Sequence, residues 1–546
     1  MVTTLFGIQL ASRDDPLANV RSVRSWCAQL PRNDPVGAVE AIIGLLAAAG
    51  GSPQEISANR TQALLELDRI AIPLQAQLRE QYRMSAMSDE VRQRLWRACD
   101  DLARWFAHAY DEIAGLQTGG RPRGRAALHG VFARLFHYLG VQTRQGLFRY
   151  EQWIPGRWRR LHDVYRDACE QGVVAEPYTP DPALAGAHLS AEQEYVQILL
   201  LHLLNTGNLT PQQIDWAAEW LHEWAPQLSL AMTPLEGDGY WLDLGRGEGL
   251  LRRKPKQAAG DLLYLAVGPL RAELGALQAR LEAQGGAQPG PGDRDEKLAL
   301  VRQLDRLWLP RAPEKPRRGE RRLVEYAVSV AVGWPEIIAA LATKFVRKSG
   351  VPAGYHYDDY GRLQPDKDVG KTAAEPRRAD SDAWHIHDSS DSGFRIRSYA
   401  QQAARQRPGA LVALQLQDHP RWQVGIVRRI KRLGSAQTEL GVEIISRNAA
   451  LIMPREIDGS ETGYSVDGVE IGNKSLSFHA LYLPAPPPAR AGGNSAAGTS
   501  LVLPTAEFTR GRSLSLVVDG HHHELCLGAP LERSKDWVWS AVDTAA

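Results

Sequence analysis

A glycine- and proline-rich break separates two parts of this sequence in which apolar residues repeat with different periods. Residues Gln284 to Gly292 read QGGAQPGPG, and glycine and proline are the residues least compatible with a helix interior. Before the break, from about Val36 to Ala283, apolar residues such as Leu64 and Leu67 recur three and four apart among helix-forming residues. This spacing predicts a large region of amphipathic helices.

After the break the apolar period changes from that of a helix to that of a strand. One more helix is predicted at Glu296 to Leu309 and another at Pro335 to Lys348. Between and beyond them lie short alternating segments separated by turn residues: Val328 to Val332, Phe394 to Arg397, Leu411 to Leu416, Trp422 to Ile430 and Leu440 to Ile445. Short strands at this spacing predict a small antiparallel β-barrel.

These patterns predict a multidomain α+β protein, with a large all-α N-terminal region followed by the barrel and a small β-rich extension. At 546 residues the chain is too long for a single core. We expect a helical region at 1–283, a linker and connecting helix at 284–310, a barrel at 311–482 with an insert at about 335–382, a spacer at 483–498 and a C-terminal extension at 499–546. The spacer is the run LPAPPPARAGGNSAAG.

Composition narrows the possible functions. Lys and Arg total 64 against 63 for Asp and Glu, so the chain has no overall field that would attract nucleic acid. Its four cysteines are far apart and show no C-x-x-C spacing, which favours a reducing, cytoplasmic compartment over a disulfide framework. No apolar run reaches the roughly 18 residues of a membrane span, so we expect neither a span nor export.

A cationic cluster precedes the first predicted strand. Residues Arg311 to Arg322 read RAPEKPRRGERR, and Arg317, Arg318, Arg321 and Arg322 lie just before that strand. The planar guanidinium fork donates two parallel hydrogen bonds to phosphate, or to guanine O6 and N7, and stays charged. The cluster is therefore suited to a guanine nucleotide, although most arginine clusters are simply solvated surface.

A second polar segment lies much later, between two predicted strands. Residues Trp384 to Arg397 read WHIHDSSDSGFRIR, with Asp388, Ser390 and Gly393 in the order D-x-S-x-x-G. A carboxylate accepts hydrogen bonds from guanine N1 and N2, serine adds a hydroxyl, and glycine permits a close or left-handed backbone approach. This segment and the arginine cluster are complementary to one guanine nucleotide.

An R-x-x-x-R element followed by D-x-S-x-x-G and barrel strands resembles the PilZ domain of bacterial proteins. The resemblance covers roughly Arg311 to Arg447. It implies that the chain is a second-messenger receptor for cyclic di-GMP, with the arginines and the D-x-S-x-x-G residues as the ligand-binding groups. An intercalated dimer of cyclic di-GMP is a form of the ligand that the resemblance allows. The resemblance also implies that the helical region, or a partner protein contacting it, responds to the ligand.

Two features leave alternatives open. Arg317 with Arg321 and Arg318 with Arg322 both fit R-x-x-x-R, and we slightly favour the first pair. The insert between Arg321 and Asp388 is longer than a simple barrel needs, so its residues either cover the ligand or fill a site that has lost it. In the latter case the chain is an adaptor or scaffold with a PilZ-like barrel that binds no nucleotide.

No enzyme is expected. The sequence has no phosphate-binding loop, dinucleotide-binding fingerprint or zinc-protease helix, and no recognisable nucleophile with its base. The glycine-rich GRGEG at Gly245 to Gly249 lacks the lysine and hydroxyl of a phosphate-binding loop and is interpreted as a turn. Neither a metal nor a cofactor is expected, and cyclic di-GMP is the only small-molecule ligand that we predict.

Overall fold

The computed structural model describes most of the chain. The described residues are 4–5, 8–9, 15–31, 33–50, 58–83, 88–118, 125–153, 155–180, 189–233, 239–252, 261–283, 293–309, 322–348, 355–357, 363–365, 384–399, 406–416, 421–434, 437–456, 465–466, 469–470, 477–484, 499–518 and 521–544. The chain forms two compact units, Met1–Pro316 and Arg317–Ala546. The domain limits given above stay a prediction.

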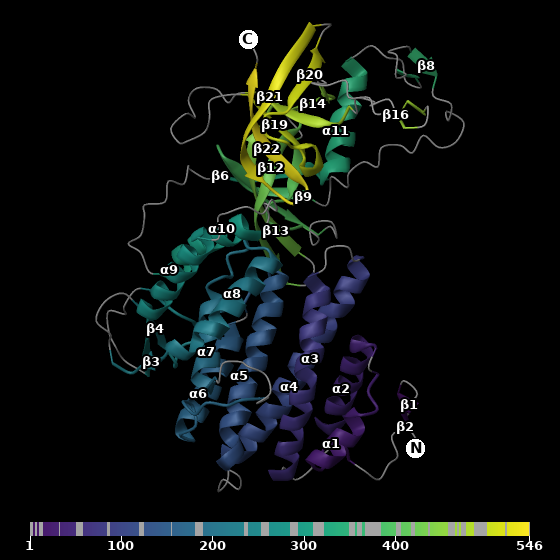
Figure 1. Ribbon diagram of the computed structural model, residues 1–546. Coiled ribbons are helices and arrows are strands. Elements are labelled where there is room, and N and C mark those ends of the chain that lie inside the picture. The colour runs from purple at the N-terminus through teal and green to yellow at the C-terminus, as the bar shows by residue number, and fades with distance from the viewer. Residues whose placement is uncertain are drawn as a thin grey trace. The chain divides into compact units, whose positions relative to one another are not determined.

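The first unit is built mainly from helices, in agreement with the helical period of its sequence (Figure 1). They are α1 Val20–Cys27, α2 Pro35–Gly50, α3 Ala58–Arg83, α4 Asp89–Thr118, α5 Arg125–Phe148, α6 Pro155–Glu170, α7 Ala191–His202, α8 Pro211–Trp224, η1 Ala225–Gln227, α9 Gly268–Ala283 and α10 Asp293–Trp308, with a short strand pair β1 Thr4–Leu5 and β2 Ile8–Gln9 before them. Helix α8 begins with a capping box in which Thr210 and Gln213 bond reciprocally, as its sequence predicts.

A buried ion pair lies in the core between α3, α4 and α5. The carboxylate of Asp68 accepts hydrogen bonds from Nε and Nη2 of Arg134, at 2.6 and 2.8 Å, and from the hydroxyls of Tyr110 and Tyr138. Burial alone would raise the pKa of Asp68, but the charge of Arg134 and these hydrogen bonds hold it below its ordinary value. Because every charge there is paired, the cluster fixes the packing of the three helices.

A small sheet interrupts the helices where the sequence analysis expected none. Strands β3 Leu230–Ala231, β5 Leu262–Ala266 and β4 Gly239–Asp243 pair in that order. Tyr240 and Leu242 of β4 are buried in the same core as the helices. The sheet was missed because two five-residue apolar segments are too short for their period to distinguish strand from helix.

The second unit contains the predicted antiparallel barrel. Its strands are β6 Arg322–Val332, β9 Trp384–Ser390, β10 Gly393–Ser398, β11 Leu411–Leu416, β12 Gln423–Leu433 and β13 Gln437–Ser446. They close in the order β10-β13-β12-β11-β6-β9, and every neighbouring pair is antiparallel. The strand-like periods therefore predicted both the architecture and the approximate strand positions.

The long insert leaves the barrel pairing intact. It contains α11 Trp334–Lys348 and a strand pair, β7 Tyr355–Tyr357 and β8 Leu363–Pro365. Strand β6 before the insert pairs directly with β9 after it, with Leu323 opposite Asp388. The side chain of Ile337 in α11 is buried with barrel residues such as Val424 and Ile426, so the helix packs on the barrel's outer surface.

A seven-stranded sheet completes the second unit, in the order β14-β18-β19-β22-β21-β20-β15. Its strands are β14 Ala450–Ile452, β15 Arg455–Glu456, β18 Ala480–Leu483, β19 Ser500–Pro504, β20 Ser513–Val518, β21 His521–Arg533 and β22 Trp537–Thr544; the 3-10 turn η4 Thr505–Glu507 and the separate pair β16 Ser465–Val466 and β17 Val469–Glu470 lie among them. The sequence analysis assigned residues of β14, β15 and β18 to the barrel region. Pairing of Leu481 with Val502 instead places β18 beside β19, a long-range contact that strand periodicity cannot predict.

The sheet and the barrel share a core and polar contacts. Val502 and Trp537 of the sheet are buried with α11 and barrel residues, and the Trp537 indole Nε1 donates to the carbonyl of Gly409 at 3.1 Å. Arg428 of β12 bonds Glu532 of β21 through Nη2 at 2.7 Å. The sheet is thus packed against the barrel.

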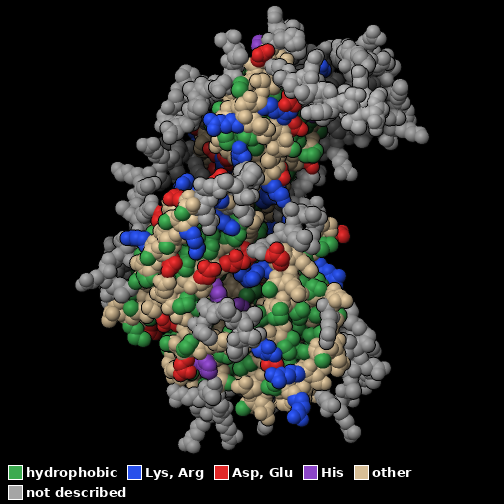
Figure 2. Space-filling view, in the orientation of Figure 1, with side chains coloured by type: hydrophobic (Ala, Val, Ile, Leu, Met, Phe, Trp, Pro, Cys, Tyr) green, Lys and Arg blue, Asp and Glu red, His purple; other side chains and the backbone are tan. Residues whose placement is uncertain are grey.

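In the space-filling view, basic and acidic side chains are interspersed on both units (Figure 2), consistent with the near balance of charge. Among the helices that the structure describes, none is long and apolar enough to cross a membrane.

A half-buried histidine in the first unit, packed between tryptophan rings, predicts a pH-dependent stability. The ring of His202 packs edge-on against Trp153 and Trp158, with centroids 4.9 Å apart in both cases, and burial lowers its pKa from 6.5 to about 4. The unfolded chain takes up this proton near pH 6.5 but the folded chain only near pH 4. Stability is therefore complete above pH 6.5 and falls by up to about 3 kcal/mol as the pH drops through this window.

In His202→Phe, which keeps an aromatic ring but cannot take up a proton, urea unfolding followed at pH 7 and pH 4.5 should show a smaller loss of stability than in wild type. The exposed His108 beside Glu112 provides the control, because His108→Gln should follow the wild-type pH dependence. If the free energy of unfolding falls equally in His202→Phe and in wild type between pH 7 and pH 4.5, the pH dependence does not come from His202.

Candidate functional site

The D-x-S-x-x-G residues form a tight hairpin at one end of the barrel. Asp388 and Ser390 lie on β9, Gly393 begins β10, and Ser390 pairs with Gly393 across the two-residue connection. The Ser390 hydroxyl donates to the Gly393 carbonyl at 3.3 Å and lies 3.4 Å from the Ser392 hydroxyl. The serine therefore helps to fix the hairpin as well as offering a polar group at its tip.

Gly393 is required by close strand packing. A Cβ atom added to it would lie 2.1 Å from the carbonyl oxygen of Val442 on β13, a separation no side chain can occupy. The structure thus gives this glycine a role in strand packing, and its predicted role in ligand binding stays a prediction. The glycine lets β10 approach β13 closely beside Asp388.

An irregularity in β9 lies immediately before Asp388. Asp388 pairs with Arg395, but Ile396 pairs with Ile386, so His387 has no partner on β10. A register shift at the same place interrupts the pairing with β6. Such bulges occur at barrel rims and redirect side chains, and this one lies next to Asp388.

The Asp388 carboxylate is buried and forms an ion pair. Its side chain is 4% exposed and pairs with Nη2 of Arg395, whose side chain is 33% exposed. An unpaired carboxylate in this position would be costly, so Arg395 is the partner that compensates the burial of the Asp388 side chain. The sequence alone does not pair Arg395 with Asp388, since cross-strand register cannot be read from one strand.

The barrel brings the end of the arginine cluster to this hairpin. Arg322 is exposed at the start of β6 and lies opposite Ser389 of β9, one strand spacing of about 4.8 Å away. Arg317, Arg318 and Arg321 lie outside the described residues. Which arginines bind a ligand, and in which register, stays a prediction, as does the ligand-binding role of Asp388, Ser390 and Gly393.

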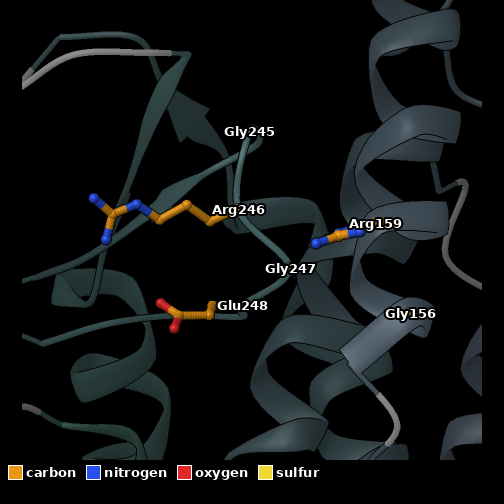
Figure 3. A pocket seen from close by; sticks show the side chains of 6 residues that line it. All are labelled: Gly156, Arg159, Gly245, Arg246, Gly247 and Glu248. Carbon is orange, nitrogen blue, oxygen red and sulfur yellow. The ribbon is translucent and has the colours of Figure 1, made fainter.

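Away from the barrel, a hollow with a volume of about 520 Å³ lies in the helical unit (Figure 3). It is lined by Gly156, Arg159, Gly245, Arg246, Gly247 and Glu248. Figure 3 shows Arg159 of α6 pointing toward the glycine loop, whereas Arg246 and Glu248 extend to the far side of that loop. The charges in this hollow are mixed and do not converge.

The glycine loop beside this hollow is held by structural contacts. Arg246 forms an ion pair with Asp243, at 3.2 Å from its Nε, and the amide of Arg246 donates to the Asp243 carbonyl. The loop is thus a turn, as predicted. His162 Nε2 lies 2.9 Å from the Glu248 carbonyl, and a Cβ at Gly249 would collide with Trp158. Among the described residues no cluster of histidine, cysteine and carboxylate suits a metal ion.

The close packing at Gly393 predicts that even one methyl group there is destabilising. Gly393→Ala should lower the free energy of unfolding of the second unit by about 1–3 kcal/mol, since the Val442 carbonyl has to move. Gly441→Ala on β13 is a matched control, because its Cβ would meet the Arg429 Cβ at 3.3 Å and the Arg429 backbone only at 3.9 Å, both longer than the 2.1 Å at Gly393. Thermal unfolding of both variants measures the difference in stability. Equal stability of Gly393→Ala and Gly441→Ala would contradict the predicted effect of close packing at Gly393.

Comparison with known proteins agrees with this architecture. Residues 21–234 match the family model described as the N-terminal domain of the cyclic-di-GMP receptor FimW, and residues 352–450 match that receptor's middle PilZ domain. The PilZ match contains β9 to β13 and the D-x-S-x-x-G residues, but it begins after the arginine cluster. The helical region and the barrel are therefore each recognised independently.

The chain is also 25% identical over 239 residues to the cyclic-di-GMP receptor FimW of Pseudomonas aeruginosa. This similarity covers 40% of the chain and 36% of that protein, so the chain spans about a third of the relative's length. No solved structure matches. The two family models together match more than half of the chain, and we conclude that it belongs to the PilZ-domain family of cyclic-di-GMP receptors with an N-terminal helical region.

Proposed function

We propose that this chain is a cytoplasmic receptor that binds cyclic di-GMP at the β9–β10 hairpin of its barrel. The observation that carries the proposal is the direct pairing of β6 with β9, which places Arg322 opposite Ser389, inside the D-x-S-x-x-G segment, despite the insert. A carboxylate, a hydroxyl and a guanidinium then lie within neighbouring strands. The family descriptions support the choice of ligand.

In this proposal guanine replaces part of the ion pair that Asp388 makes in the ligand-free chain. The N1 and N2 donors of guanine bond the Asp388 carboxylate, which supplies the two acceptors that this edge of the base needs. Ser390 adds a hydroxyl at the tip of the hairpin. Arg322, together with Arg317, Arg318 and Arg321, binds phosphate or the O6 and N7 edge of guanine through paired hydrogen bonds.

Ligand binding then shifts an equilibrium between arrangements of the chain. The arginine cluster belongs to the sequence that joins the two compact units, whose boundary falls between Pro316 and Arg317. A ligand that binds these arginines in only one arrangement favours that arrangement by its difference in affinity. The helical region, or a partner protein that contacts it, receives the signal in this proposal; the ligand itself undergoes no reaction.

One observation favours the alternative, an adaptor that binds no nucleotide. Asp388 is buried and already paired with Arg395, an arrangement that is stable without a ligand. In such an adaptor the same hairpin would serve only to hold the barrel together. The two functions differ in a single measurable property, namely binding of cyclic di-GMP.

Isothermal titration calorimetry of the full chain tests the receptor proposal. Wild type should bind cyclic di-GMP, and Asp388→Ala should weaken binding more than tenfold, because guanine loses a charged acceptor that is worth about 1.5–3 kcal/mol. Arg322→Ala should also weaken binding, through loss of a phosphate contact.

Glu439→Gln is the matched control, since Glu439 also pairs with an arginine of β10, Arg397, at 3.0 Å. Its affinity should stay within about threefold of wild type, well short of the tenfold that 1.4 kcal/mol represents. Absence of binding by folded wild type would reject the receptor and support the adaptor.

A further inference from the structure

A single row of residues crosses five strands at the level of Asp388. Leu323 of β6 lies opposite Asp388 of β9, Asp388 opposite Arg395 of β10, Arg395 opposite Gly441 of β13, and Gly441 opposite Arg429 of β12. We name these five residues the Asp388 row. Directly opposed residues in antiparallel strands project from the same face, so their side chains share one surface of the barrel.

The arginines in this row are less fully paired with carboxylates than the neighbouring arginines are. Arg397 is paired with Glu439, and Arg428 with Glu443 and Glu532. Arg429, by contrast, is exposed and has no ion pair with any residue that the structure describes. Arg395 keeps a third of its side chain exposed while paired with Asp388. Besides Asp388, the row therefore contains two guanidinium groups: that of Arg395, which is paired with Asp388 but partly exposed, and that of Arg429, which is available to a ligand.

Gly441 places no side chain between these two cations. A Cβ placed there would meet the Arg429 side chain at 3.3 Å and the Arg429 backbone only at 3.9 Å, so the glycine is not required by strand packing as Gly393 is. With a strand spacing of about 4.8 Å, Arg395 and Arg429 are anchored about 10 Å apart, and Asp388 and Arg429 about 14 Å apart. The row is thus long enough to contact more of a ligand than one base.

We propose that Arg395, Gly441 and Arg429 form a second anion-binding position, which receives a phosphate of the dinucleotide whose guanine is bound by Asp388. This inference rests on the proposed function and adds residues outside both sequence motifs. When the N–H donors of guanine occupy Asp388, the Arg395 guanidinium is released toward the gap above Gly441. In that position Arg395 and Arg429 approach one phosphate from opposite sides. Each guanidinium donates two parallel hydrogen bonds to the phosphate oxygens.

Calorimetric titration of the full chain with cyclic di-GMP tests this position through two independent variants. Arg429→Gln removes the available charge and should weaken binding roughly tenfold, the usual effect of losing a charge-assisted hydrogen bond. Gly441→Leu fills the gap while retaining both arginines, and should weaken binding to a similar extent. Arg397→Gln, on the same face but already paired with Glu439, should stay within about threefold of wild type.

The outcomes separate this inference from the proposed function. If wild type binds and Asp388→Ala does not, yet folded Arg429→Gln and Gly441→Leu both bind like wild type, the second anion position is rejected and the receptor stands. If wild type does not bind, the receptor itself is rejected. Circular dichroism melting of each variant ensures that a loss of binding is not a loss of fold.

Discussion

The pairing of β6 with β9 is the contact on which the second unit depends. It closes the barrel across a long insert and sets Leu323 opposite Asp388 and Arg322 opposite Ser389. Without this pairing the arginine cluster and the D-x-S-x-x-G segment would be distant parts of one sequence. With it, the carboxylate, hydroxyl and at least one guanidinium of the proposed nucleotide site lie on adjacent strands, positioned by backbone hydrogen bonds rather than by flexible loops.

The rest of the unit supports this barrel from outside. Helix α11, supplied by the insert, and Val502 and Trp537 of the C-terminal sheet pack against barrel residues in one shared core. The insert that first argued against a nucleotide site thus contributes to the stability of the barrel that carries it. Arg428 also bonds both Glu443 of the barrel and Glu532 of the sheet. The C-terminal sheet therefore holds a side chain of β12, the strand that also carries Arg429.

Sequence patterns predicted the features of the fold that depend on residues close together in the chain. The change of apolar period located the helical region and the barrel strands, and the local sequence Thr210 to Gln213 is that of the capping box with which α8 begins. Partners set by long-range register were not predictable: the sheet formed by β3, β4 and β5, the place of β18 beside β19, and the pairing of Arg395 with Asp388 each depend on strands brought together only by folding.

Hydrogen–deuterium exchange of the full chain, with and without cyclic di-GMP, tests the central claim most directly. Binding at the β9–β10 hairpin should slow amide exchange in peptides covering residues 384–398 and the facing strand 437–446, because the ligand would hold these strands closed. Unchanged exchange there at saturating ligand would contradict this account, as would protection confined to the helical unit, for example around the loop at 245–249.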